Sequence, residues 1–218
     1  MLRTVSVGSR KKWYTLYNGP EGAPSIGKGG QSMSFITTFT GLHMDPFNPD
    51  ASLIRLEDVA HSLSRLCRAN GHLRGFYSVA QHCLACEGEA AARGEAPRVR
   101  LACLLHDAAE AYMSDLPRPL KAMLPQYSVA EERLLRVIWQ RLAGEPLSHA
   151  ERRVVGDVDD DMMSWEFHCM MAEEVNERWR NLKSPPTCRF EPFDDVELRY
   201  KATAGALRER CRSDSSRG

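Results

Sequence analysis

The chain has 218 residues, and its 29 Lys and Arg residues are balanced by 29 Asp and Glu residues, so the formal net charge is zero. This length is sufficient for one substantial hydrophobic core, and a hydrophobic content of 43% is ordinary for a soluble globular protein. The balanced charge excludes a general electrostatic attraction to nucleic acid or to anionic membranes, so we expect neither as a partner.

The first segment, residues 1–33, is rich in Gly, Ser and Pro, a composition typical of a flexible extension. The residues that follow, 35–40, are β-prone and end at Gly41, which predicts at most a small hairpin before the main body. We assign residues 34–212 to one helical domain. The polar residues 213–218 are expected to form a disordered tail.

The main body begins near residue 53, where apolar residues start to recur at three- and four-residue steps. This periodicity predicts helices over residues 56–71, 78–94, 97–116 and 128–144, from 148 into the 170s, and across 196–207. Three of these helices open with a capping box, in which Ser and a Glu or Gln three residues later satisfy free backbone N–H groups. The pairs are Ser78 with Gln81, Ser128 with Glu131, and Ser148 with Glu151. The sequence thus predicts an all-α fold.

The seven cysteines are odd in number, and several fall inside apolar helical patterns, where Cys behaves as a small buried hydrophobe. We therefore expect a reducing, cytoplasmic compartment without disulfides. Cys83 and Cys86 have the spacing of half a zinc motif, but a second pair is missing, so we assign them to core packing. Neither a run of about 18 apolar residues nor the apolar stretch of a signal peptide is present.

One predicted helix carries polar residues directly after an apolar run. Leu104 and Leu105 lead into His106, Asp107 and Glu110. Burying such groups is costly unless they are paired or bind a metal ion. On a regular α-helix, His106 and Glu110 share a face, and Asp107 lies about 100° round from His106.

Two further candidates come from other helices. His82 lies in the first turn of the helix that precedes this one, and Asp159 lies in the helix that starts at residue 148. Facing helices of a bundle commonly form metal sites from single inward side chains, and two imidazoles with two carboxylates suit a first-row divalent ion. A core histidine and a solvated acidic helix face would give the same residues, so both interpretations stay open at this point.

Three segments resemble the HD-domain nucleotide phosphohydrolases, in the branch of bacterial 5′-deoxynucleotidases and of phage triphosphohydrolases that act on dATP. They are residues 77–82, residues 106–121 and residues 155–159. The resemblance covers roughly residues 50 to 170, and Asp160 or Asp161 could replace Asp159 in the last segment. It implies an HD-domain helical bundle that hydrolyses the phosphate ester or anhydride of 5′-deoxynucleotides.

The resemblance also implies the ligands of one divalent metal ion, which could be Mn, Co, Zn, Fe, Ni or Mg. These ligands would be His82, His106, Asp107 and Asp159. Glu110 would assist the attacking water or the proton transfer to the leaving oxygen, and Asp115 would contact the sugar hydroxyl. Ser114 stands where the family carries Gly, a departure that bears on the shape of the sugar pocket.

An arginine upstream of the first histidine would contact the phosphate, and Arg65 and Arg68 are alternatives for that role. His61, His72 and Lys121 are further candidates for binding the small-molecule nucleotide. Since relatives are often dimers or larger, we also expect a homo-oligomer. A dNTP triphosphohydrolase, a cyclic-nucleotide phosphodiesterase and a catalytically silent helical binding module remain as alternatives to a 5′-deoxynucleotidase.

Overall fold

The computed structural model of the chain describes residues 35–171 and 176–215. The chain divides into two units, residues 1–34 and residues 35–218, and every described residue belongs to the second unit. The predicted flexible extension over residues 1–33 therefore lies outside the described residues, as do residues 216–218 of the predicted tail.

The expected hairpin is present and small. Strands β1 (Ile36–Thr37) and β2 (His43–Met44) pair antiparallel, with Ile36 opposite Met44. Gly41 in the connecting turn has a φ of +81°, which glycine adopts without steric cost. The backbone N–H of Thr40 donates to Asp58 at 2.7 Å, so the hairpin is tied to the first helix of the main body.

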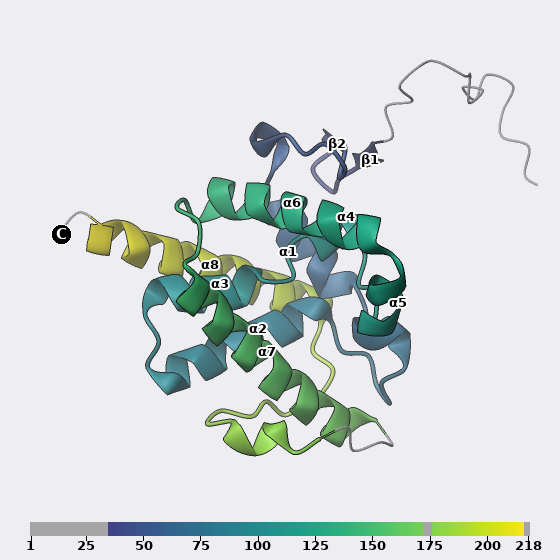
Figure 1. Ribbon diagram of the computed structural model, residues 1–218, viewed down its shortest axis with the longest axis vertical. Coiled ribbons are helices and arrows are strands. Elements are labelled where there is room, and N and C mark those ends of the chain that lie inside the picture. Colours follow the sequence, from purple (N-terminus) through teal and green to yellow (C-terminus); the bar gives the residue numbers. More distant parts are fainter. Residues whose placement is uncertain (1–34, 172–175, 216–218) are drawn as a thin grey trace, which may run out of the picture. The chain divides into compact units, whose positions relative to one another are not determined.

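The rest of the described chain is mainly helical, which confirms the prediction of an all-α fold (Figure 1). The α-helices are α1 (Leu56–Arg65), α2 (Val79–Arg93), α3 (Pro97–Leu105), α4 (Glu110–Met113), α5 (Arg118–Met123), α6 (Pro125–Leu142), α7 (His149–Met170) and α8 (Phe193–Ser215). Short 3₁₀ segments occur at Ala51–Leu53, Arg68–Gly71 and Arg178–Asn181. Among the described residues, no helix is both long and apolar enough to cross a bilayer.

The core lies where α2 and α3 pack against each other and α8 packs across α1 and α3. Helix α7 crosses α2 and α3 (Figure 1) and also packs on the segment Arg178–Asn181. Tyr200 of α8 is fully buried and donates its hydroxyl to the carbonyl of Leu104 at 2.7 Å, so its one polar atom is satisfied within the core. This packing fixes the ends of α2 and α3 relative to the middle of α7.

Two of the three predicted capping boxes are confirmed, those of α2 and α7. The third is wrong, because Ser128 lies inside α6 rather than before it. Pro125 occupies the first position of α6, where its missing N–H costs nothing, and the helix therefore starts earlier. Helix α5 was not predicted, because Pro117 and Pro119 indicate a helix stop, whereas Pro119 is again compatible with a first helical turn.

The helix predicted over residues 97–116 is not continuous. It tightens after Leu105, where Ala108 N–H donates to the carbonyl of Leu105 at 3.0 Å and Glu110 N–H donates to that of Asp107 at 2.9 Å. In such three-residue turns, side chains three positions apart share a face. Glu110 therefore shares a face of this turn with Asp107.

Helix α8 extends through Ser215, three residues into the segment assigned to a disordered tail. The segment contains neither Pro nor Gly before Gly218, and Ser213 Oγ donates to the carbonyl of Glu209 one turn earlier at 3.0 Å. The helical pattern of hydrogen bonds therefore continues past residue 212.

Candidate metal centre

The structure brings together His82, His106, Asp107 and Asp159 from α2, the turn after α3, and α7. Nε2 of His82 lies 3.2 Å from Nε2 of His106 and 3.1 Å from Oδ1 of Asp159. Oδ2 of Asp107 lies 3.3 Å from Nε2 of His106 and 3.9 Å from Nε2 of His82. Four donor atoms from three parts of the chain thus meet at one point.

The hydrogen bonds of the two histidines fix which ring nitrogen carries hydrogen. Nδ1 of His106 lies 2.8 Å from the carbonyl oxygen of Cys103, which can only accept. Nδ1 of His82 lies 2.7 Å from Oε1 of Glu166, whose pKa is lowered: burial raises it, but His82 and Arg68 outweigh that effect. Both Nδ1 atoms therefore donate, and in the neutral imidazoles both Nε2 lone pairs point at the shared centre.

This arrangement fits a metal ion. Lone pairs and carboxylate oxygens facing one another at close range repel unless positive charge lies among them. Ligand atoms about 2.0–2.2 Å from a cation, at tetrahedral or octahedral angles, are separated by roughly 3–3.5 Å. The three shortest separations in the cluster, 3.1, 3.2 and 3.3 Å, fall in that range.

The close approach of imidazoles and carboxylates also shifts the pKa values of the cluster. Burial would lower the pKa of His106, but the neighbouring Asp107 raises it well above its usual range. Burial would raise the pKa of Asp107, but the imidazole of His106 lowers it strongly. The carboxylates thus give this buried point a negative potential, which favours a cation of any kind.

Two cysteines also approach the histidines. The groups His82–Cys86–His106 and Cys83–His106–Asp107 each place their donor atoms within 4.8 Å of one another. The Sγ atom of Cys86 lies 3.6 Å from Nε2 of His82. Both thiols are buried, as their assignment to core packing predicts, and burial raises the pKa of Cys83. The centre therefore offers a sulfur side toward the core and a carboxylate side toward a cavity.

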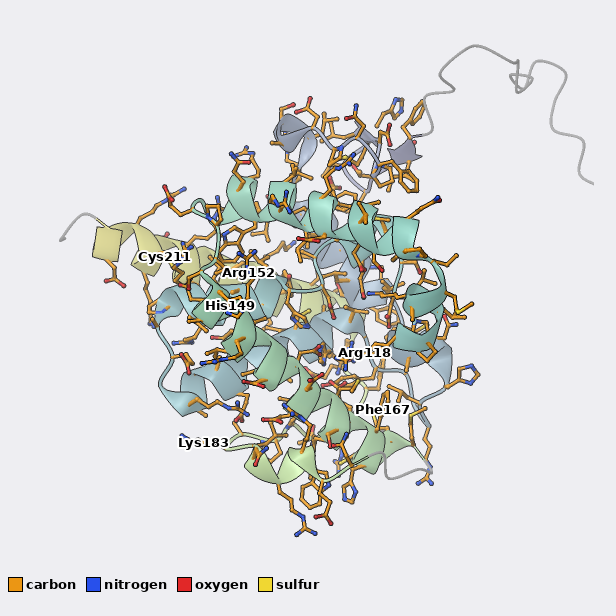
Figure 2. All side chains as sticks on the ribbon, in the orientation of Figure 1. Arg118, His149, Arg152, Phe167, Lys183 and Cys211 are labelled. Atoms are coloured by element: carbon orange, nitrogen blue, oxygen red, sulfur yellow. The ribbon has the colours of Figure 1, made fainter. Side chains whose placement is uncertain are left out.

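That cavity has a volume of about 420 Å³, and Asp107 and Asp159 form part of its wall. Five of the other residues predicted from the sequence line it as well: Arg68, His72, Glu110, Asp115 and Lys121. Figure 2 shows Arg118 of α5 and Phe167 of α7, which border the same cavity. The cavity beside the candidate metal ligands is thus lined by both charged and apolar side chains.

Arg68 is a buried cation beside both carboxylates of the cluster. Its side chain is buried, its Nε donates to Oε2 of Glu166 at 2.7 Å, and its two terminal nitrogens lie 3.5 Å from Asp107 and 3.6 Å from Asp159. Arg65, the other candidate, lies elsewhere. It pairs with Asp194 and Glu197 of α8 and lines a different cavity, as does His61.

Glu110 has a strongly perturbed carboxyl group in the cavity wall. Burial, together with the nearby charges of Asp107 and Asp115, raises its pKa to about 9, although Lys121 Nζ lies 3.1 Å from its Oε1. Its Oε2 is buried and has no hydrogen-bond partner among the described residues. The raised pKa favours the protonated form of Glu110, whose side chain lines the cavity.

Asp115 is held by the backbone near Arg68. Its Oδ2 accepts a hydrogen bond from the N–H of Ala69 at 3.1 Å. Ser114, immediately before it, has a φ of +74° and a ψ of 157°, a conformation that favours Gly. The departure from Gly noted in the sequence thus falls at a position where the backbone is strained.

Two residues of the centre were not identified from the sequence. Glu166, fully buried, joins His82 to Arg68, and Arg118 donates to Oδ2 of Asp159 at 2.9 Å. Glu166 follows Asp159 by seven residues, or about two helical turns, so the two share a face of α7. That spacing was a usable signal, whereas the pairing of Arg118 with Asp159 depends on how α5 packs.

No protein-family model matches the chain. The chain is similar to the uncharacterized protein YfdR of Escherichia coli K12, with 43% identity over 117 residues, or 53% of this chain and 62% of that protein. It is also similar to the uncharacterized protein RCAP_rcc00048 of Rhodobacter capsulatus, with 39% identity over 108 residues, or 47% of this chain and 55% of that protein. The chain thus spans just over half the length of these curated relatives.

Proposed function

We propose that the chain is a metal-dependent phosphohydrolase of the HD-domain kind that acts on 5′-deoxynucleotides. Its metal ligands would be His82, His106, Asp107 and Asp159. The observation that carries this proposal is the convergence of two Nε2 lone pairs and two carboxylates, with each Nδ1 fixed as a donor by a buried acceptor.

The two carboxylate ligands are favoured over the cysteines by their position. Asp107 and Asp159 face the cavity, whereas neither Cys83 nor Cys86 is among the described residues that line it. A substrate in this cavity would reach a metal ion from the carboxylate side. Mixed imidazole and carboxylate ligands suit Mn, Fe, Co, Ni or Zn, while thiolates would favour a closed zinc site.

The surrounding side chains match the needs of phosphoryl transfer. When bound, a divalent ion activates water near neutral pH and polarises a phosphoryl oxygen. Arg68, whose terminal nitrogens lie beside both ligand carboxylates, would neutralise the charge on the remaining phosphoryl oxygens. Lys121, beside Glu110, and Arg118 add further cations to the cavity wall.

Glu110 would act as the proton donor to the leaving oxygen. Without a bound metal ion its pKa is raised to about 9, mainly by burial, which favours the protonated form that a general acid requires. Of the two roles expected for Glu110 from the sequence, this favours proton transfer to the leaving oxygen over assistance to the attacking water. Asp115 uses Oδ2 for the N–H of Ala69, which leaves Oδ1 for a sugar hydroxyl.

A substrate screen tests this proposal. The purified full chain would be incubated with deoxynucleoside mono- and triphosphates, ribonucleotides and cyclic nucleotides, each with Mn²⁺, Co²⁺, Mg²⁺ or Zn²⁺. We expect hydrolysis of 5′-deoxynucleotides, and ion-exchange analysis of the products would separate a monophosphatase from a triphosphohydrolase. Preferred turnover of cyclic nucleotides would replace the proposal with a phosphodiesterase.

The matched variants are His106→Ala and His149→Ala. His149 is an exposed histidine at the start of α7, away from the cluster (Figure 2). We expect the first variant to lose activity and bound metal, as measured by elemental analysis, and the second to keep both. A wild-type chain that hydrolyses none of these substrates with any ion would refute the proposal. The expected homo-oligomer stays a prediction, which light scattering on the same sample tests.

A further inference from the structure

Glu166 is a carboxylate that uses both oxygens inside the protein. Its side chain is fully buried in α7, Oε1 accepts from Nδ1 of His82 at 2.7 Å, and Oε2 accepts from Nε of Arg68 at 2.7 Å. One residue thus contacts a proposed metal ligand and the proposed phosphate-binding cation at the same time.

We propose that Glu166 is a positioning residue, which fixes the tautomer of His82 and the orientation of Arg68 together. The inference rests on the proposed function of the site and assigns a residue that touches neither the metal ion nor the substrate. Through Glu166, the metal site and the phosphate contact would form as one unit, and neither would be correctly arranged without it.

The effect on His82 follows from hydrogen-bond chemistry. A carboxylate paired with a guanidinium accepts hydrogen bonds and has none to donate. Nδ1 of His82 must therefore carry the hydrogen, and Nε2 keeps the lone pair that faces His106 and Asp159. Carboxylates that bind the second nitrogen of a metal-ligating histidine commonly raise metal affinity in this way.

The effect on Arg68 follows from its position in the chain. Arg68 opens a short 3₁₀ segment in which Ala69 and Asn70 both have positive φ, so its backbone is not part of a regular helix. Glu166 holds Nε, which leaves the two terminal nitrogens directed at Asp107 and Asp159. A long side chain fixed at one end of its guanidinium loses little entropy when it binds phosphate.

An amide at this position could serve only one of the two partners. If the Gln oxygen accepts from His82, its NH₂ group faces the N–H of Arg68 and displaces the guanidinium. If the Gln oxygen accepts from Arg68, its NH₂ group donates to Nδ1 of His82 and moves the imidazole hydrogen to Nε2. Glu166→Gln therefore separates a positioning role from the mere filling of space.

The test compares Co²⁺ binding to the wild type, Glu166→Gln and Glu89→Gln. Glu89 is an equally buried carboxylate, but it pairs with Arg93 and with the backbone N–H groups of Lys183 and Ser184, away from the cluster. We expect Glu166→Gln to lower Co²⁺ affinity by about 10- to 100-fold and to change the visible spectrum of the bound ion. Glu89→Gln should keep the wild-type affinity and spectrum.

Inorganic phosphate provides the readout for Arg68. Its inhibition constant, measured with the metal-loaded protein, should rise in Glu166→Gln but not in Glu89→Gln. If Glu166→Gln binds Co²⁺ and phosphate like the wild type, the positioning role is refuted. The proposed function is judged separately, since it fails if the wild type binds no metal or does not hydrolyse 5′-deoxynucleotides.

A measurement on the wild type covers the case in which Glu166→Gln does not fold. Nitrogen-15 spectra of the zinc-loaded chain, labelled at histidine, report which ring nitrogen of His82 carries hydrogen. We expect hydrogen on Nδ1 and the metal on Nε2. The opposite assignment would overturn the inference without any substitution.

Discussion

Arg65 and Arg68 stand three residues apart in the chain and point to different parts of the molecule. Arg65 ends α1 and pairs with Asp194 and Glu197 of α8, whereas Arg68 reaches the candidate metal centre. They separate because the helix ends between them: Cys67 forms an extended bridge with Ser78, which redirects the chain.

This separation predicts different effects of the two substitutions. Arg68→Ala should raise the KM for the phosphorylated substrate and lower kcat, because it removes the cation beside both ligand carboxylates. Arg65→Ala should leave both constants near their wild-type values, since its partners lie on α8. Steady-state kinetics of the two variants measure this directly. Equal losses in both would show that the cavity near α7 is not where phosphate binds.

Some residues of the site could be predicted from local sequence patterns. His106 and Asp107 follow an apolar run, and His82 follows a capping box, so each could be placed at the end of a buried helix. The choice between Arg65 and Arg68 was not predictable, because spacing alone does not reveal that α1 ends at Arg65.

Other features depended on tertiary contacts. The seven-residue spacing from Asp159 places Glu166 on the same face of α7. Its contacts with His82 and Arg68, however, form only when α2 and the segment at Arg68 pack against α7. The tightening of the chain between Leu105 and Glu110 was not predictable either, because the segment contains neither Gly nor Pro and includes the good helix formers Ala108 and Ala109. Helix propensity alone therefore could not predict this turn or the cavity beside it.

Glu110 should make stability depend on pH. Its pKa is about 9 in the folded protein against 4.5 for an ordinary Glu, so between these values the folded state holds a proton that the unfolded chain has lost. The unfolding free energy then falls as pH rises through this window. Glu110→Gln, which cannot ionise, should therefore gain stability relative to the wild type from about pH 5 to about pH 8.

Thermal unfolding of the metal-free proteins across that pH range checks this expectation. Glu132→Gln is the control, because Glu132 lies on the exposed surface of α6, and it should show no such pH-dependent gain. A difference between Glu110→Gln and the wild type that is constant with pH would mean that Glu110 ionises normally in the folded protein.

The backbone conformation of Ser114 predicts that Ser114→Gly stabilises the folded protein. Its φ of +74° with ψ of 157° lies in a region that is costly for residues with a Cβ atom, by about 1–3 kcal/mol. Ser114→Gly should relieve this strain, and after the greater flexibility of Gly in the unfolded chain we expect a net gain of about 1 kcal/mol. Urea unfolding measures the gain.

The same substitution in a helix should have the opposite sign. Ser128 lies inside α6, where Gly is unfavourable, so Ser128→Gly should lose roughly 0.5 kcal/mol. If both variants lose stability equally, the backbone at Ser114 is not strained.

Metal binding should stabilise the folded chain by mass action. At a Mn²⁺ concentration of about 100 times Kd, the gain is about 2.7 kcal/mol, which corresponds to a rise in Tm of roughly 5–10 °C for a chain of this size. His106→Ala and Asp159→Asn should each abolish the rise, because each removes a ligand of the cluster. The double variant Cys83→Ala, Cys86→Ala should keep it, since the proposed ligands are nitrogen and oxygen atoms. Loss of the Mn²⁺ response in the cysteine variant, with retention in Asp159→Asn, would instead place the ion on the sulfur side of the histidines and away from the cavity.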